Sequence, residues 1–201
     1  VSGIATVVLL YCPSSVSKEI RAGREHMFYC MFILCLTGLL GIAITGDAFN
    51  VFVFLEISSL SSYALIAMGS QRKALTASFQ YLIMGTIGAT FFLIGVGLLY
   101  MITGTLNLAD LQTRIPQIQD SRPLLAAFAF ITVGLALKAA LFPLHLWLPN
   151  AYAYAPSGVS AFMAATATKV SLYVLLRFTF TLFGAEFAFG ELPLHWVLLV
   201  P

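Results

Sequence analysis

The sequence predicts an all-α fold, a polytopic bundle of transmembrane helices. Hydrophobic residues make up 60% of the 201 residues and charged residues only 9%, whereas soluble domains are about half apolar and a quarter charged. The mean hydropathy is +0.97. Apolar runs close to the roughly 20 residues that a helix needs to cross a bilayer recur along the chain. Because lipid offers the backbone no hydrogen-bond partners, helices are the expected structure of these runs.

Five windows are predicted to span the membrane. In chain order they cover residues 27–45, 48–69, 79–103, 124–151 and 158–182. We expect them to form the main repeat, at about 27–182, of a single transmembrane domain that covers residues 1–201. The chain starts at Val1 inside an apolar stretch and stops as another apolar run, 196–200, begins. These ends predict a fragment of a longer protein.

The basic residues of the loops predict an orientation. The span count puts two basic loops on one side of the membrane, with Lys18, Arg21, Arg24, Arg72 and Lys73. The opposite side holds Arg114 and Arg122, with Arg177 near a helix end. Since short cytoplasmic loops carry the excess of Lys and Arg, the first side is predicted to be cytoplasmic. The protein is thus expected to be a multi-pass protein of the cell membrane.

The polar segment 104–123 separates two of the windows. Leu106, Leu108, Leu111, Ile115 and Ile118 recur in it at partly helical spacing. It is therefore expected either to lie along the outer membrane interface or to be an ordinary loop with a short helix.

Three ionisable residues fall near the predicted membrane midplane. They are Glu56, Lys138 and Lys169, each in a different window. A charge at that depth costs about 2.5 to 3.5 kcal/mol on insertion scales, so each needs a partner, internal water or neutralisation. The group predicts a proton relay. The alternative is a buried ion pair that only fixes helix packing, but two lysines with one glutamate leave a surplus amine.

Polar residues accompany two of these charges. Ser59 lies one turn after Glu56 and shares its helix face, while Thr166 and Tyr173 are expected to share the face of Lys169 and to look inward. These side chains are possible supporting groups of the relay. The alternative for the serines that surround Glu56 is that they bond back to their own helix or allow close helix approach.

A proline-rich run follows Lys138. Pro143, Pro149 and Pro156 lie within fourteen residues, and proline removes a backbone donor and clashes with the preceding turn. The helix is predicted to break near residue 141, at a depth where irregular backbone is tolerated only within protein or beside water. His145 lies in this break, and its unperturbed pKa near 6.5 makes it a candidate relay group.

The remaining polar and sulfur-containing residues are given structural roles. Cys12, Cys30 and Cys35 are read as packing residues, because no His or carboxylate stands near them at ligand spacing. No metal site is therefore expected. Asp47 is read as a helix N-cap in preference to a carboxylate on the ion entry path. The basic residues form no patch that would track DNA or RNA, so no nucleic acid is expected as a partner.

Two stretches resemble the proton-conducting antiporter-like subunits of respiratory complex I and Mrp-type antiporters. They are TGDAFNVFVFLEISSLSSYAL at 45–65 and LKAALFPLHLWLPNAYAYAPSGVSAFMAATATKVSLYVLLRF at 137–178. The resemblance covers most of the chain from Met27 onward. It implies a fold of two inverted five-helix repeats, each contributing half of an ion path. This chain would hold the first repeat, with its Pro-broken helix.

The resemblance also assigns roles to residues. Glu56 matches the glutamate of the family's fifth helix, Lys138 the lysine of the broken seventh and Lys169 the lysine of the eighth, and His145 falls in the PLH run. The chain departs from the family where Asn150 replaces the acid of WLPDA and where Tyr152 follows it in place of a frequent His or acid.

The predicted function is translocation of protons, or of a cation coupled to protons, by a subunit of a Mrp-type antiporter or of a complex I-like NADH:quinone oxidoreductase. Other membrane subunits, protons and Na⁺ are the expected partners. The sequence has no dinucleotide fingerprint, iron–sulfur spacing or haem motif, so no cofactor and no catalytic redox residue are expected. Two alternatives stay open: a structural membrane scaffold, and an intramembrane enzyme that uses Glu56 or His145 as a general base.

Overall fold

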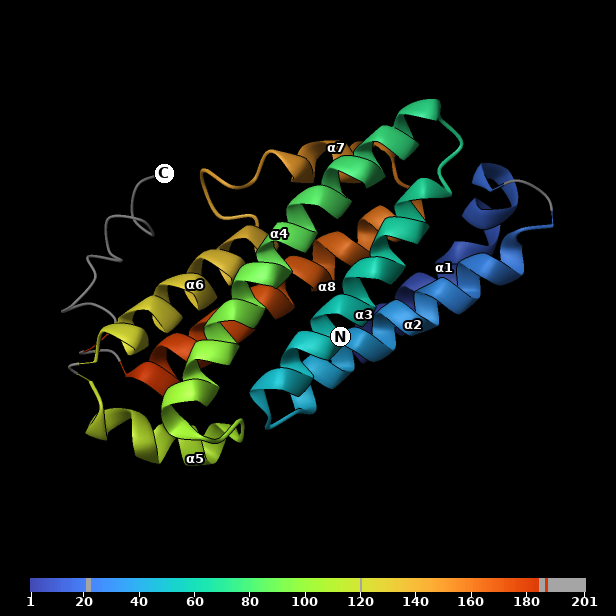
Figure 1. Cartoon of the computed structure of the whole chain (residues 1–201). Helices are drawn as coiled ribbons and strands as arrows, with labels where there is room; N and C mark the ends of the chain where they lie inside the picture. Colours follow the sequence, from blue (N-terminus) through green and yellow to red (C-terminus); the bar gives the residue numbers. More distant parts are fainter. Residues whose placement is uncertain (21–22, 120, 185–186, 188–201) are drawn as a thin grey trace.

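The computed structural model describes residues 1–20, 23–119, 121–184 and 187, which fold into a bundle of helices (Figure 1). Arg21 and the apolar run 196–200 lie outside the described residues. The only strand-like pairing in the described part is an isolated bridge between Asp47 and Asn107. The all-α prediction is confirmed. The elements in chain order are α1 Ser2–Glu19, α2 Glu25–Ile44, α3 Ala48–Ala67, α4 Arg72–Thr103, α5 Leu108–Arg114, η1 Ile115–Gln117, α6 Arg122–Lys138, α7 Trp147–Tyr154, α8 Ser157–Leu176 and η2 Arg177–Phe183.

Four helices of the described chain are long and apolar enough to cross a membrane. They are α2, α3, α4 and α8 together with its continuation η2, and each coincides with a predicted window. Helix α4 begins at Arg72, earlier than the window at 79–103, because Arg72 and Lys73 lower the hydropathy but favour helix. Helix α6 has 17 residues, so it extends roughly 25 Å, short of a bilayer core of about 30 Å.

The predicted helix break is present between α6 and α7. Helix α6 ends at Lys138, where Leu141 N–H donates to the Ala136 carbonyl at 2.9 Å and Ala140 N–H to the Leu137 carbonyl at 3.2 Å. This bond pair, with Ala140 at φ +56°, is a Schellman termination, which needs a left-handed residue. Pro143 follows two residues after the motif ends. Lys138 is therefore the last helical residue before the break.

Glycines allow the central helices to approach closely. A Cβ on Gly134 of α6 would lie 2.6 Å from the Gly88 carbonyl oxygen of α4, and a Cβ on Gly38 of α2 would lie 2.6 Å from the Ser58 amide nitrogen of α3. Small residues at such crossings maximise van der Waals contact where lipid supplies no hydrophobic drive. The first crossing holds α6 against α4 and the second holds α2 against α3, while Gly85 of α4 leaves room for the Tyr63 hydroxyl of α3.

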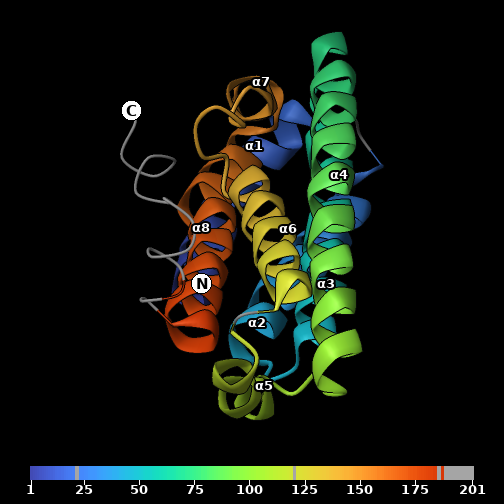
Figure 2. The ribbon, with the colours of Figure 1, turned by 60° about the vertical axis from the view of Figure 1, so that its left-hand side comes forward.

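The segment 104–123 closes one end of the bundle. Figure 2 shows α5 at the end opposite α7, and Leu111 and Ile115 of this segment are fully buried. Its start is tied to the N-terminus of α3, since Ala48 N–H donates to the Leu106 carbonyl at 2.8 Å. The Asp47 carboxylate accepts from Asn50 N–H at 2.8 Å, which confirms the cap role. The segment is thus a packed cover with a short helix.

The two basic loops that were predicted to share a side do lie together. A pocket of about 340 Å³ is lined by Ile20 and Arg24 from the first loop region and by Met68 and Arg72 from the second. Arg114 lies at the other end, where it donates to the Thr103 carbonyl at 2.7 Å. The grouping of basic residues by side is therefore confirmed for the described residues.

Candidate functional site

Glu56 of α3 and Lys138 of α6 form an ion pair inside the bundle. The Lys138 ammonium lies 3.1 Å from Glu56 Oε1. The Lys138 side chain is 4% exposed and the Glu56 side chain is 25% exposed. A charge on a nearly fully buried lysine is stabilised only by such a partner, because few waters reach it. The close approach of α3, α4 and α6 therefore joins two of the three predicted mid-membrane charges.

Ser59 provides a second acceptor for the same ammonium. Lys138 Nζ donates to Ser59 Oγ at 2.6 Å, and Ser59 is one turn beyond Glu56 on α3. Both acceptors therefore come from the same helix face, as expected for an i, i+3 pair. Lys138 lies between an anionic oxygen and a neutral one.

The other serines around Glu56 have the structural role that was the alternative. Ser58 donates to the Leu55 carbonyl at 2.9 Å, Ser61 to the Ile57 carbonyl at 2.7 Å and Ser62 to the Ser58 carbonyl at 2.8 Å. Each of these three hydroxyls thus donates a hydrogen bond within its own helix, as hydroxyls in membrane helices often do. Ser59 alone of this run contacts Lys138 among the bonds of the described residues.

A small cavity adjoins Lys138. It measures about 10 Å³, and its polar lining is Ser58, Ser59, Ser62, Tyr81 and Ser171. A cavity needs about that volume, with two or more polar partners, to hold one water molecule. The site therefore has room for a single bridging water beside the ion pair.

Lys169 does not join the pair, contrary to the expectation that its face looks inward. Lys169 is exposed on this chain, and its ammonium donates to the Ala164 carbonyl of its own helix. Tyr173 is 45% exposed, whereas Thr166 is buried at 1% and bonds the Phe162 carbonyl at 2.6 Å. The bundle packs on the Thr166 side of α8 and leaves Lys169 and Tyr173 at the exposed edge of that helix.

His145 lies in the break between α6 and α7. Its Nδ1 is buried without a hydrogen-bond partner among the described residues, and its ring packs on Phe142 with centroids 5.6 Å apart. A buried nitrogen without a partner is costly.

The positions where the chain departs from the family that it resembles lie in α7. Asn150 donates to Gln80 Oε1 of α4 at 3.1 Å, so its amide links the two helices. Tyr152 borders an open pocket of about 510 Å³ that Glu19 and Ser160 also line. The Tyr152 hydroxyl itself is buried, and apart from an interaction with the Thr168 side chain it has no hydrogen-bond partner in the described part. Neutral side chains thus stand where an acid or a histidine is common.

Two serine hydroxyls of α8 donate to backbone carbonyls. Ser160 donates to the Tyr152 carbonyl at 2.7 Å and Ser171 to the Ala167 carbonyl at 3.1 Å, so neither hydroxyl is paired with a general base. Within the described ranges no cluster of three or more His, Cys, Asp or Glu side chains is placed to hold a metal.

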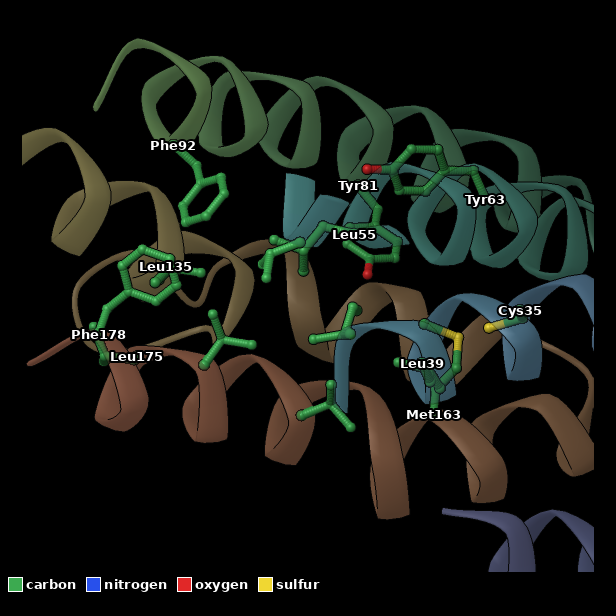
Figure 3. Packing of buried hydrophobic residues seen from close by; sticks show 14 of the residues in the cluster. Cys35, Leu39, Leu55, Tyr63, Tyr81, Phe92, Leu135, Met163, Leu175 and Phe178 are labelled. Carbon is green, nitrogen blue, oxygen red and sulfur yellow. The ribbon is translucent and has the colours of Figure 1, made fainter. Parts of the chain in front are cut away.

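Two contacts between distant parts of the chain were not predicted from the sequence. The Glu19 carboxylate of α1 accepts from the Ser157 amide and hydroxyl, both at 2.7 Å, and so caps α8 from another helix. Tyr63 of α3 packs edge-on against Tyr81 of α4, with ring centroids 4.6 Å apart (Figure 3). The i+4 spacing of Tyr63 from Ser59 places these two side chains on one face of α3, but nothing local links residues 63 and 81 or residues 19 and 157.

Comparison with known proteins gives consistent matches. A family model described as NADH:quinone oxidoreductase/Mrp antiporter, transmembrane, matches residues 45–199. An NADH-quinone oxidoreductase subunit of Desulforudis audaxviator is 55% identical over 158 residues, which are 78% of this chain and 31% of that protein. A Na⁺/H⁺ antiporter subunit of Alkalihalophilus pseudofirmus is 36% identical over 89% of this chain and 36% of that protein.

A solved structure shows the same fold. A chain of the membrane-bound sulfane sulfur reductase, an archaeal respiratory membrane complex, superposes with a TM-score of 0.79 at 38% identity, over 87% of this chain and 36% of that chain. The present chain thus spans about a third of the length of the curated relatives it matches.

Proposed function

Because the chain belongs to the NADH:quinone oxidoreductase/Mrp antiporter transmembrane family, we propose that it is the part of a membrane subunit that passes protons through Glu56 and Lys138. Its relatives are named as an NADH-quinone oxidoreductase subunit and as a Na⁺/H⁺ antiporter subunit. The proposal is proton translocation, alone or coupled to a cation such as Na⁺, in a complex with other membrane subunits.

The buried Glu56–Lys138 pair carries this proposal. Its ammonium and carboxylate are 3.1 Å apart within a bundle of membrane-spanning helices, and the protonation of one such group changes the proton affinity of the other. Lys138 is also the last residue of α6, so its backbone adjoins the irregular segment 139–146. Broken helices of this kind occur at the ion sites of transporters.

Lys169 and His145 are proposed as further stations of the relay. Lys169 is exposed on this chain, in a helix whose other face packs on the bundle. A lysine in such a position is suited to pass protons to whatever covers α8 in the complete subunit. His145, whose buried Nδ1 has no hydrogen-bond partner among the described residues, lies in the break between α6, which carries Lys138, and α7.

The test uses the full-length subunit, assembled with its partner subunits and reconstituted in proteoliposomes. Glu56→Gln and Lys138→Ala are expected to abolish proton flux while leaving assembly intact. Glu25→Gln and Lys18→Ala are matched controls, because these residues are exposed at the helix ends. Their flux is expected to equal that of the unmodified protein.

Two results would contradict the proposal. Normal flux in Glu56→Gln would show that the pair is not on the proton path. Lost assembly in both Glu56→Gln and Lys138→Ala, with normal flux per assembled complex, would instead support the structural scaffold.

A further inference from the structure

Ser59 differs from the neighbouring serines in the hydrogen bonds of its hydroxyl. Ser58, Ser61 and Ser62 each donate to a carbonyl of the preceding turn. Among the described residues, Ser59 makes no bond of this kind, and its oxygen instead accepts from Lys138 at 2.6 Å. A hydroxyl that accepts from an ammonium is a stronger acceptor when it donates in turn. Ser59 therefore calls for an acceptor of its own.

Tyr63 supplies a group in the right place. It lies one turn beyond Ser59 on α3, on the same helix face, and its hydroxyl interacts with the Ser59 side chain. Tyr63 is only 5% exposed, and apart from this interaction its oxygen has no hydrogen-bond partner within the described part of the chain. A buried hydroxyl without a partner costs about 1 to 3 kcal/mol, so its presence needs a reason.

The surroundings of Tyr63 fix its hydroxyl where it is. Its ring packs edge-on against Tyr81 at 4.6 Å, and Tyr81 stacks on Trp147 of α7 at 4.0 Å. On the α4 side the hydroxyl fills the space that Gly85 leaves, since a Cβ there would overlap the hydroxyl oxygen. The ring has little freedom to turn, so the oxygen stays beside Ser59.

We propose that Tyr63 is a positioning residue for Lys138, acting through Ser59. In this arrangement the Ser59 hydroxyl donates to the Tyr63 oxygen and presents its lone pair to Lys138 Nζ. The inference rests on the proposed function, because it assigns Tyr63 a role in the same relay. Its consequence is that Lys138 keeps a neutral acceptor when a proton neutralises Glu56, and so stays in the relay during each transfer.

Few other groups among the described residues could support the Lys138 ammonium. The ionisable side chains around Lys138 are Glu56 and Tyr63 of α3 and Tyr81 of α4, with Cys35 of α2 next to Ser62 at 3.4 Å. Helix α8 contributes Ala167 and Ser171 to the cavity, and Ser171 already donates to its own helix. The Ser59 and Tyr63 hydroxyls are thus the uncharged groups that support the Lys138 ammonium.

The experiment compares variants of the full-length subunit in its complex, by proton flux in proteoliposomes over a range of pH. Tyr63→Phe removes only the hydroxyl, and the loss of one buried hydrogen bond predicts a fall in flux of roughly 3- to 10-fold. Ser59→Ala is expected to fall at least as far, and the double variant no further than Ser59→Ala. The pH profiles of both single variants are expected to move in the same direction. Ser61→Ala, which also removes a buried serine hydroxyl, is the control and should transport normally.

A second set of variants guards against a trivial loss of folding. Ser59→Thr keeps the hydroxyl and is expected to retain most of the flux, whereas Gly85→Ala crowds the tyrosine oxygen and should resemble Tyr63→Phe in its pH profile. Additive effects of Ser59→Ala and Tyr63→Phe, or an unmoved pH profile in assembled Tyr63→Phe, would overturn the role of Tyr63.

Failure of the proposed function looks different. If Glu56→Gln also transports normally, the relay itself is absent. If Glu56→Gln is inactive while Tyr63→Phe is normal, only the role of Tyr63 is refuted.

Discussion

Lys138 shows how a membrane helix accommodates a charged residue. The Lys138 side chain is 4% exposed, and two of its three N–H donors bond Glu56 and Ser59, an anion and a hydroxyl. Removing one partner would leave a buried charge without compensation, a change that costs about 3 to 5 kcal/mol in buried pairs. Replacing either Glu56 or Lys138 alone is therefore expected to be costly.

Lys169, unlike Lys138, is a lysine without an anionic partner among the described residues. Its ammonium is exposed on this chain and, within the part that the structure describes, bonds only a carbonyl of its own helix. Lys169→Met should therefore leave the thermal stability of the bundle unchanged. If the relay is as proposed, the same variant lowers proton flux at least about tenfold, which corresponds to about 1.4 kcal/mol on a barrier. Flux in proteoliposomes and thermal unfolding measured on one preparation separate the two effects.

Lys18→Met is the matched control for Lys169→Met. Lys18 is an exposed lysine in the last turn of α1, and neither flux nor stability is expected to change in this variant. Normal flux in Lys169→Met would remove this residue from the relay and leave Glu56, Lys138 and His145 as its proposed members.

The elements are held in place by close backbone approach. The carbonyl of Gly88 and the amide of Phe92 lie close to where a Cβ on Gly134 would be, at 2.6 and 2.8 Å. Since both atoms belong to the α4 backbone, they cannot move without separating α4 from α6. This crossing fixes the end of α6, and with it Lys138, relative to α4, which also packs against α3.

Gly134→Ala should therefore destabilise the bundle by about 2 kcal/mol, within the range of overpacked cores. Gly97→Ala in α4 is the control, because nothing lies within 4 Å of a Cβ at that position. There alanine is expected to be neutral or to stabilise by up to about 1 kcal/mol. Thermal unfolding of the purified complex measures both, and equal stabilities would contradict the role of the crossing.

At the scale of the molecule, both ends of the bundle contain surface pockets. The end with Arg24, Arg72 and α7 has pockets of about 340 and 510 Å³, and the α5 end has pockets of about 170 and 380 Å³. If the end with Arg24 and Arg72 is cytoplasmic, as the positive-inside rule predicts, the first two pockets face the cytoplasm. The Lys138 site lies in the interior between these ends.

Cysteine labelling in a cysteine-free background tests this orientation. Gln71 and Gln117 are exposed at opposite ends of the described chain. In intact cells, an impermeant maleimide should label Gln117→Cys directly and Gln71→Cys only after permeabilisation. The reverse pattern would invert the predicted topology, and equal labelling of both would contradict the assignment of the two ends to opposite sides.

The sequence by itself determined the helices and the residues at issue. Apolar windows located the spans, since lipid leaves the backbone no alternative to helix, and Pro143 located the break to within a few residues. Depth along a span singled out Glu56, Lys138 and Lys169, because ionised groups are rare there. These features depend on local composition, so they can be read from neighbouring residues.

Only the tertiary structure decided which of these residues meet. It paired Glu56 with Lys138 across 82 positions of sequence, turned Lys169 outward and placed Tyr63 against the Gly85 gap. Such contacts depend on which face of each helix packs against a neighbour, and on where glycines let helices approach. A helix that is apolar all round does not encode its inward face in its own periodicity, so packing had to settle it.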